Sequence, residues 1–193
     1  MTKQAQLTLL TNQWRDCTKC AIGHYSYKHV FGRGNPLAKI MLIGEAPGKT
    51  EDYFGKPFVG ASGQLLDEAL RGAGLPPEMV YITNTVSCRP CDSPSGGNRE
   101  PSDTEIKNCS DRLYGTIMIV KPVLIVAVGS VADMTLRLYK KSTFVMPRLV
   151  KIHHPAWVLR HGGVNRSGTA FKAYVDEIKE VIRKWFTIST PTA

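Results

Sequence analysis

No apolar run in the sequence approaches the roughly 18 residues that a membrane-spanning helix requires. Residues 1–10 contain one lysine and a short apolar patch, but no basic segment followed by a long apolar stretch and a small-residue cleavage site. This pattern is not that of a secretory signal peptide. We therefore expect a cytoplasmic protein with no membrane partner.

Acidic residues are scarce relative to basic ones. The chain has 16 Asp and Glu against 25 Lys and Arg, a net charge of +9 and an isoelectric point near 9.4. A basic surface gains affinity for nucleic acid because it releases counterions from the phosphates. Many proteins are basic for other reasons, so charge alone leaves nucleic-acid binding and an ordinary solvated surface equally open.

Cysteine is sparse but clustered. In a reducing compartment, clustered cysteines more often bind metal or carry out redox chemistry than form disulfides. Two Cys-x-x-Cys pairs could form a four-cysteine zinc site, and the fifth cysteine competes as the fourth ligand of a cluster. Spacing leaves both alternatives open. The five cysteines are Cys17, Cys20, Cys88, Cys91 and Cys109.

Hydrophobic and charged fractions of 42% and 21% predict one globular domain over residues 1–193. Apolar segments predict strands at 39–44, 79–87, 122–129 and within 148–155. Helices are predicted at 4–16, at 60–74, from a Ser102/Glu105 capping box to about 120, at 130 to about 140, and at 170–186. Residues 88–103 predict a loop, and the tail is expected to fray from about residue 187.

Strands that alternate with helices favour a parallel sheet covered on both faces. In such sheets, ligands bind beyond the carboxyl ends of the strands. Here "GEAPG" follows the first predicted strand, "TN" and "SCRP" lie toward the end of the second, and "HHPAW" follows the fourth. We expect these polar loops to meet at one edge of the sheet.

In order along the chain, "CTKC", "GEAPGKTEDYFGKPFVGASGQLL", "ITNTVSCRP", "GNREP" and "HHPAW" resemble the motifs of family 4 uracil-DNA glycosylases, an iron-sulfur branch of their superfamily. The resemblance runs from about Cys17 to Lys184. It implies a three-layer α/β/α sandwich with a central four-stranded parallel sheet. It also implies a monofunctional enzyme that flips uracil out of DNA and hydrolyses its N-glycosidic bond in base excision repair, leaving an abasic site.

The same resemblance implies a structural [4Fe-4S] cluster. The matching ligand positions are Cys17, Cys20, Cys88 and Cys109. Cys91 departs from the family, which more often has proline there, and it is the alternative fourth ligand because it completes a Cys-x-x-Cys pair. Zinc is the alternative metal.

Three positions match the family's base pocket. Phe58 matches an aromatic residue that stacks on the flipped uracil, although a Phe beside Val59 can also be an ordinary core residue. Asn84 matches an amide that reads the uracil edge, although a strand-end Asn can also form a turn. His154 matches a donor to uracil O2, and its neighbour His153 is expected to be structural.

The position that orients the attacking water in related branches has a different residue in this sequence. Related branches carry Asp or Asn where this sequence has Ala46, so we expect Glu45 to orient the water, with Glu51 or Asp52 as alternatives. The expected catalytic residues are Glu45 and His154. The expected substrate contacts are Gly44, Ala46, Glu51, Phe58 and Asn84.

DNA contacts are expected from Arg89, Trp157 and Arg160. The loop "HPAWVLRHGG" would insert Trp157, Val158 or Leu159 into the gap left by the base, with Arg160 and His161 near phosphates. The substrate would be double- or single-stranded uracil-containing DNA, bound by a monomer of a bacterial, archaeal or phage-infected cell, with a sliding clamp or replication protein as a possible partner. Two alternatives stay open: action on another deaminated or modified base, and a non-catalytic DNA-binding module of replication or phage machinery.

Overall fold

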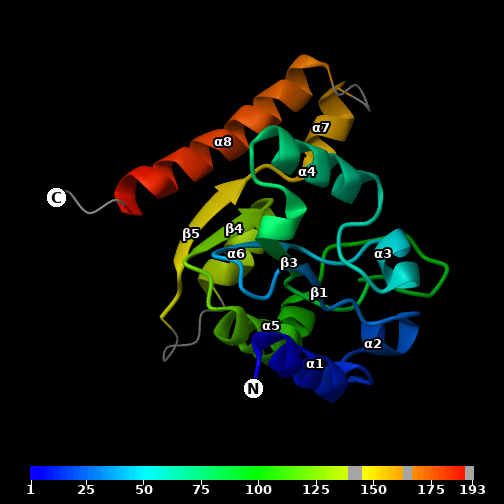
Figure 1. Ribbon diagram of the computed structural model, residues 1–193. Helices are drawn as coiled ribbons and strands as arrows, with labels where there is room; N and C mark the ends of the chain where they lie inside the picture. The colour runs from blue at the N-terminus through cyan, green and yellow to red at the C-terminus, as the bar shows by residue number, and fades with distance from the viewer. Residues whose placement is uncertain (139–144, 163–166, 190–193) are drawn as a thin grey trace.

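The computed structural model describes residues 1–138, 145–162 and 167–189, with side chains as far as residue 184. At its centre is a five-stranded sheet with the order β1-β3-β2-β4-β5. Four strands are parallel: β2 (Ile40–Gly44), β3 (Val80–Asn84), β4 (Leu124–Val128) and β5 (Arg148–Ile152). The four predicted parallel strands are thus confirmed (Figure 1).

The fifth strand corrects the expectation of a purely four-stranded parallel sheet. β1 (Gly32–Gly34) pairs with the edge of β3 in the antiparallel direction. It consists of Gly, Arg and Gly, so it has none of the apolar or β-branched residues by which a strand is recognised in a sequence. Pairing with a longer strand, rather than local propensity, places it in the sheet.

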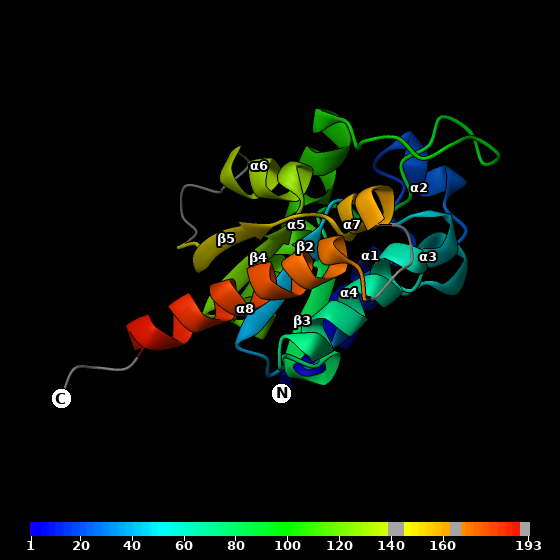
Figure 2. The ribbon, with the colours of Figure 1, turned by 90° about the horizontal axis from the view of Figure 1, so that it is seen from above.

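Helices cover both faces of the sheet, as expected for a three-layer α/β/α sandwich (Figures 1 and 2). α4 (Ala61–Gly72), α7 (Pro155–Gly162) and α8 (Thr169–Ser189) pack on one face, where alternate strand residues such as Leu42 and Ile82 point. α1 (Lys3–Trp14), α5 (Asp103–Val120) and α6 (Ser130–Leu138) cover the other face. Two short helices, α2 (Ala21–Tyr25) and α3 (Lys49–Phe54), lie at the end of the molecule toward which β2 runs, and the 3-10 helix η1 (Pro77–Met79) precedes β3.

The predicted helices are confirmed within a few residues at their ends. The capping box at the start of α5 is present: Ser102 Oγ accepts from the Glu105 N–H, and the Glu105 carboxylate accepts from the Ser102 N–H. The tail was predicted to fray from about residue 187, but α8 continues to Ser189. Residues 190–193 lie outside the described part, and so does Lys140, the predicted end of α6. Across the described ranges, no helix is long and apolar enough to span a membrane.

Candidate functional site

The carboxyl ends of β2, β3 and β5 surround an open pocket of about 420 Å³. The loops after all three strands contribute to its wall, and the one after β3, which leads to α5, closes one side. The predicted meeting of the polar loops is therefore confirmed. The lining residues used below are Glu45, Glu51, Phe58, Asn84, Arg99 and His154.

Phe58 lies in the pocket wall in a backbone conformation that a bulky residue rarely adopts. Its φ angle is +54°, in the left-handed region. This conformation costs about 1 to 3 kcal/mol, so contacts with the surrounding residues must stabilise it. Arg33 of β1 donates to the carbonyl oxygens of Pro57 and Phe58 at 2.8 and 3.2 Å. β1, the strand that was not predicted, thus supplies Arg33, which holds the backbone that carries the Phe58 ring.

The Glu51 carboxylate stabilises the same turn from the other side. Its oxygens accept from the backbone N–H groups of Val59 and Gly60 at 3.0 and 2.7 Å, and from Gly48 at 3.2 Å. Glu51 also lines the pocket, so these backbone contacts stand beside the substrate contact that was expected. Glu51 shapes the pocket by organising its wall.

Gly44 is required by the close approach of two pocket residues. A Cβ at this position would overlap the Phe58 ring and lie 2.5 Å from Asn84 Oδ1. Gly63, at the start of α4, is similarly tight against the backbone of Phe58. Glycine at these positions lets the aromatic ring and the amide lie side by side.

Asn84 ends β3 with only 2% of its surface exposed. Among the described side chains, its Oδ1 is one of few buried polar atoms without a hydrogen-bond partner. A buried acceptor left without a donor costs about 1 to 3 kcal/mol, so such an atom in a pocket indicates a ligand that donates to it.

His154 follows β5 and lines the pocket 6.4 Å from Phe58, measured between ring centroids. The backbone N–H of Ala156 donates to His154 Nδ1 at 3.1 Å, so the neutral ring carries its proton on Nε2. Burial, assisted by the charge of Arg160, lowers the pKa of His154 and favours this neutral form. His154 is therefore a neutral hydrogen-bond donor. His153, as expected, points elsewhere and contacts Glu177 of α8 at 2.9 Å.

Glu45 lies in the pocket wall, and within the described residues no hydrogen bond to its carboxylate is found. Burial raises its pKa to about 7, and the charge of Glu100 adds to the shift. The two alternatives for orienting water already have backbone donors: Glu51 accepts from three backbone N–H groups, and the buried Asp52 accepts from the Tyr27 N–H at 3.0 Å.

The cysteine positions converge from three segments of the chain. The pKa of the Cys88 thiol is raised to about 12, mainly by burial, and three other sulfur atoms lie near enough to contribute as charges: Cys109, Cys20 and Cys17. Cys91 is not among these neighbours, although it is also buried. The Asn108 amide donates to the Lys19 carbonyl oxygen at 2.9 Å, which joins α5 to the first cysteine pair.

The cysteine sulfur atoms are the donors that a zinc ion or an iron-sulfur cluster would require. Within the described residues, no set of three or more His, Cys, Asp or Glu side chains has the arrangement of ligands around one metal ion. A four-iron cluster takes one cysteine per iron, so its ligand sulfurs stand further apart than four sulfurs around a zinc ion. The buried Arg112 lies beside this group, with Nη2 3.6 Å from Cys109 Sγ. Four thiols beside a buried cation fit an anionic iron-sulfur cluster.

A family profile described as "Uracil DNA glycosylase superfamily" matches residues 31–179. The chain belongs to this superfamily. Its relatives named "Type-4 uracil-DNA glycosylase" include a protein of Archaeoglobus fulgidus, 37% identical over 74% of this chain and 78% of the relative. Another, from Saccharolobus solfataricus, is 40% identical over 76% of this chain and 65% of the relative. A third, from Thermotoga maritima, is 32% identical over 93% of this chain and 94% of the relative. The resemblance to family 4 is thus confirmed.

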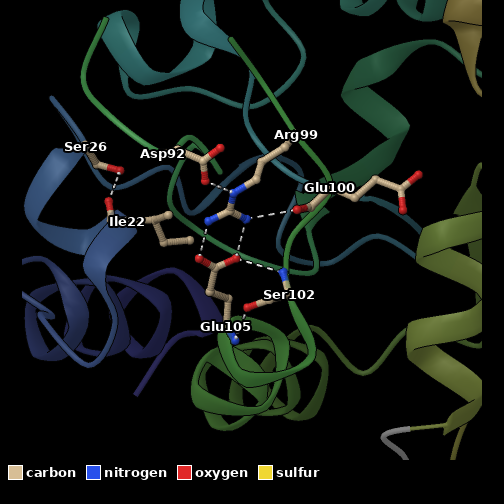
Figure 3. Close-up of polar contacts among 7 residues, drawn as sticks. All are labelled: Ile22, Ser26, Asp92, Arg99, Glu100, Ser102 and Glu105. Atoms are coloured by element: carbon tan, nitrogen blue, oxygen red, sulfur yellow. Dashed lines mark hydrogen bonds and ion pairs between the residues drawn. The ribbon is translucent and has the colours of Figure 1, made fainter. Parts of the chain in front are cut away.

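In this member of the superfamily, two arginines hold the loop between β3 and α5. Arg99 forms a two-pronged contact with Glu105, at 2.7 and 2.9 Å, and also contacts Asp92 at 2.7 Å (Figure 3). Arg89, expected to bind DNA, is only 5% exposed and donates to Asn98 and to loop carbonyl oxygens. This expectation is corrected, because the Arg89 guanidinium organises the loop from within.

The segment expected to be a DNA-inserting loop is the helix α7. Val158 packs in the core at 1% exposure, so it cannot be the wedge. Trp157 is half-buried and packs between His153 and His161, with ring centroids 5.1 and 4.8 Å apart. Arg160 is exposed on the same helix, where a phosphate contact is possible.

Two residues that build the site were missed in the sequence, Arg33 and Arg112. Arg33 lies in a strand without apolar residues, and no local signal marks it. Arg112 had a detectable signal: it follows Cys109 by three residues, which places both on one face of a helix that also buries Leu113 and Ile117. A charged residue on such a face indicates a buried partner.

Proposed function

We propose that this protein is a monofunctional uracil-DNA glycosylase that flips uracil out of DNA and hydrolyses its N-glycosidic bond, leaving an abasic site. The observation that carries the proposal is the unpartnered Oδ1 of Asn84 in a pocket that also contains Phe58 and the donor His154. DNA binding alone would need only a basic surface. An aromatic face, an amide edge and a neutral imidazole around one pocket are suited to a single base.

Selection of uracil follows from the amide. Uracil N3–H can donate to Asn84 Oδ1, while the amide nitrogen donates to O4. Cytosine has an unprotonated N3 and an amino group at the corresponding positions. It would leave Asn84 Oδ1 without a donor and would place its amino group against the amide nitrogen, which is also a donor. Loss of such buried hydrogen bonds can give large discrimination between bases.

His154 supports departure of the base. As the N-glycosidic bond breaks, negative charge accumulates on uracil O2, and a positioned N–H donor stabilises that charge. Because Ala156 fixes the proton on Nε2, the ring needs no rearrangement before it donates. Glu45 accepts a hydrogen bond from the water that attacks C1′ of the deoxyribose. The sugar takes the hydroxyl group of this water, Glu45 takes the remaining proton, and uracil leaves as an anion with the bonding electron pair.

Cys17, Cys20, Cys88 and Cys109 would hold a [4Fe-4S] cluster in this proposal. The electrostatic interaction of Cys109 with Cys88 supports it over Cys91 as the fourth ligand. When bound, the cluster supplies cross-links between the N-terminal segment, the end of β3 and α5. These cross-links brace the pocket wall, since the residues between Cys88 and Cys109 include the loop that closes the pocket.

The test is single-turnover base release from oligonucleotides that contain one uracil in U:G, U:A or single-stranded context, with hypoxanthine as the competing lesion. The expected result is free uracil and an alkali-labile abasic site. Asn84→Ala should abolish release, whereas Asn12→Ala, at an exposed position of α1, should not change it. Binding without release by the unmodified protein in excess would overturn the proposal, and preferential release of hypoxanthine would reassign the substrate.

A further inference from the structure

Three large aromatic side chains gather on the surface next to the pocket. Tyr27, Tyr53 and Phe54 are 68, 60 and 58% exposed, although each could bury an apolar ring. Tyr27 follows α2, and the other two end α3; Figure 2 shows these two helices at the same end of the molecule. Exposed apolar groups that cluster in this way usually mark a binding surface.

The rings form an ordered array. Tyr27 and Tyr53 are stacked, with centroids 5.5 Å apart and an angle of 11° between their planes. Tyr53 meets Phe54 edge to face, with centroids 5.1 Å apart and an angle of 89°. We call these three residues the aromatic platform. Because the exposed side chains of the platform are aromatic rings, it suits a planar ligand better than the apolar face of a partner helix.

The charge around the platform is positive, although the sequence "KTEDYFGK" is electrically mixed. Both of its acidic side chains turn inward: Glu51 holds the Phe58 turn, and Asp52, 8% exposed, accepts from the backbone of Tyr27. The exposed lysines next to these rings along the chain are Lys28, whose Nζ lies 5.7 Å from the Tyr27 ring centroid, and Lys56, while Lys49 lies at the pocket end of α3.

We propose that the aromatic platform binds unpaired nucleotides of the DNA strand that carries the lesion, by base stacking on the rings and phosphate contact with the lysines. This inference rests on the proposed function, since it takes DNA as the ligand. The first residues of α3, Lys49 and Thr50, line the base pocket, and the platform lies at the other end of the same six-residue helix. At a rise of about 1.5 Å per residue, the two ends are about 9 Å apart, which one or two nucleotides can span.

The geometry favours single strands over duplex. Stacking requires an accessible base face, and a duplex already covers the faces of its bases by internal stacking. Alanine substitution of stacking residues in other single-strand binders costs about 1 to 3 kcal/mol per base. The platform therefore gives the protein a means of holding single-stranded or frayed substrate while uracil occupies the pocket.

The test compares the triple variant Tyr27→Ser, Tyr53→Ser, Phe54→Ser with a matched triple variant, Leu37→Ser, Met79→Ser, Met118→Ser. The control residues are similarly exposed, at 67, 55 and 59%, and two of them, Leu37 and Met79, precede β2 and β3, at the end of these strands opposite to the pocket. Fluorescence anisotropy would measure the affinity for uracil-free single strands of about 15 nucleotides and for the matching duplex.

The platform variant should lose at least about tenfold in single-strand affinity, and less than about twofold in duplex affinity. The control variant should lose neither. Equal losses on single strand and duplex, or no loss on either, would overturn the platform. If circular dichroism shows that the triple variant does not fold, the single variant Phe54→Ser, at a position that is 58% exposed, should still lose severalfold in affinity for single strands only.

Uracil release from a substrate of about four nucleotides, too short to cover both sites, separates this inference from the proposed function. The platform variant should release uracil from it as the unmodified protein does, while its KM rises only on the longer strand. Absence of release by the unmodified protein would contradict the proposed function and leave the affinity comparison valid by itself.

Discussion

Arg112 donates from Nη2 to the backbone carbonyl oxygen of Asn84 at 2.9 Å, and the same nitrogen lies 3.6 Å from Cys109 Sγ. It also donates to the Thr85 carbonyl oxygen at 2.9 Å. At 1% exposure, it is a buried cation, and among the described residues no carboxylate is paired with it. One guanidinium thus joins the strand end that carries the pocket amide to the helix that carries Cys109, a proposed cluster ligand.

Replacing Arg112 should affect both ends of this connection. Arg112→Met leaves two buried carbonyl oxygens without a donor, so the free energy of unfolding should fall by about 2 to 4 kcal/mol in denaturant titration. It also removes a positive charge next to the proposed cluster, which should lower the cluster's reduction potential. Arg112→Lys keeps the charge and should restore the potential more than the stability. Identical potentials in both variants and the unmodified protein would show that Arg112 acts only in packing.

His154→Ala should slow uracil release by about 100- to 1000-fold, because one donor to the developing negative charge is lost. DNA affinity should change little, since the phosphate contacts lie elsewhere. The neighbouring His153→Ala is the matched control: it removes an exposed contact with Glu177 and should leave release near the original rate. Single-turnover rates and anisotropy titrations measure the two quantities. Comparable losses in both variants would contradict the assignment.

The pH dependence of release should report Glu45. If its carboxylate orients the water, the single-turnover rate should rise with pH through a midpoint near 7, the value to which burial raises its pKa. Glu45→Gln should be slower and lack this rise. Glu100→Gln removes the second cause of the shift, so its midpoint should move to lower pH while the maximal rate is retained.

The same shift has a consequence for stability with a definite sign. The folded protein holds a proton on Glu45 that the unfolded chain releases near its ordinary pKa of 4.5. The contribution of Glu45 to the free energy of unfolding is therefore fully present below 4.5 and is lost as the pH rises through about 7. Glu45→Gln should flatten this part of the curve of unfolding free energy against pH, and an unchanged slope would rule out the raised pKa.

Gly44→Ala should abolish uracil release without unfolding the protein. The added methyl group would displace the Phe58 ring and Asn84 Oδ1, the two groups that enclose the base. Gly97→Ala is the control, because a Cβ at Gly97 meets nothing within 4 Å. The measurements are single-turnover release and thermal unfolding. Full activity of Gly44→Ala would show that the pocket can open more than this structure allows.

Patterns that depend on neighbouring residues along the chain were predictable. The buried strands consist of uninterrupted apolar residues, and the Ser102/Glu105 capping box places the start of α5 correctly. The pocket residues Phe58, Asn84 and His154 could be located because they follow recognisable motifs. In contrast, α7 was expected to be a loop, although "PAWVLRHG" begins with proline at a position where a helix tolerates it.

Contacts between distant segments could not be predicted. β1 exists because β3 offers an open edge, and Arg33 in β1 then reaches the Phe58 turn from a distance of 25 residues along the chain. Glu51, Asp52 and Arg89 have charges that suit water, substrate or phosphate, but in the fold each is occupied by backbone groups or loop residues. A charge in the sequence does not show whether the folded chain uses it internally.

The sequence alone determined the order of the four parallel strands and of the long helices, the positive net charge and the chemical groups available to a base pocket, because these depend on composition and local pattern. The tertiary structure decided which of those groups remain free. It turned Glu51 and Asp52 inward, brought Cys109 near enough to Cys88 for their charges to interact, and left Asn84 Oδ1 without a partner. Hydrogen bonds and burial are satisfied between segments far apart in the chain, so only the folded arrangement determines what is left to bind a ligand.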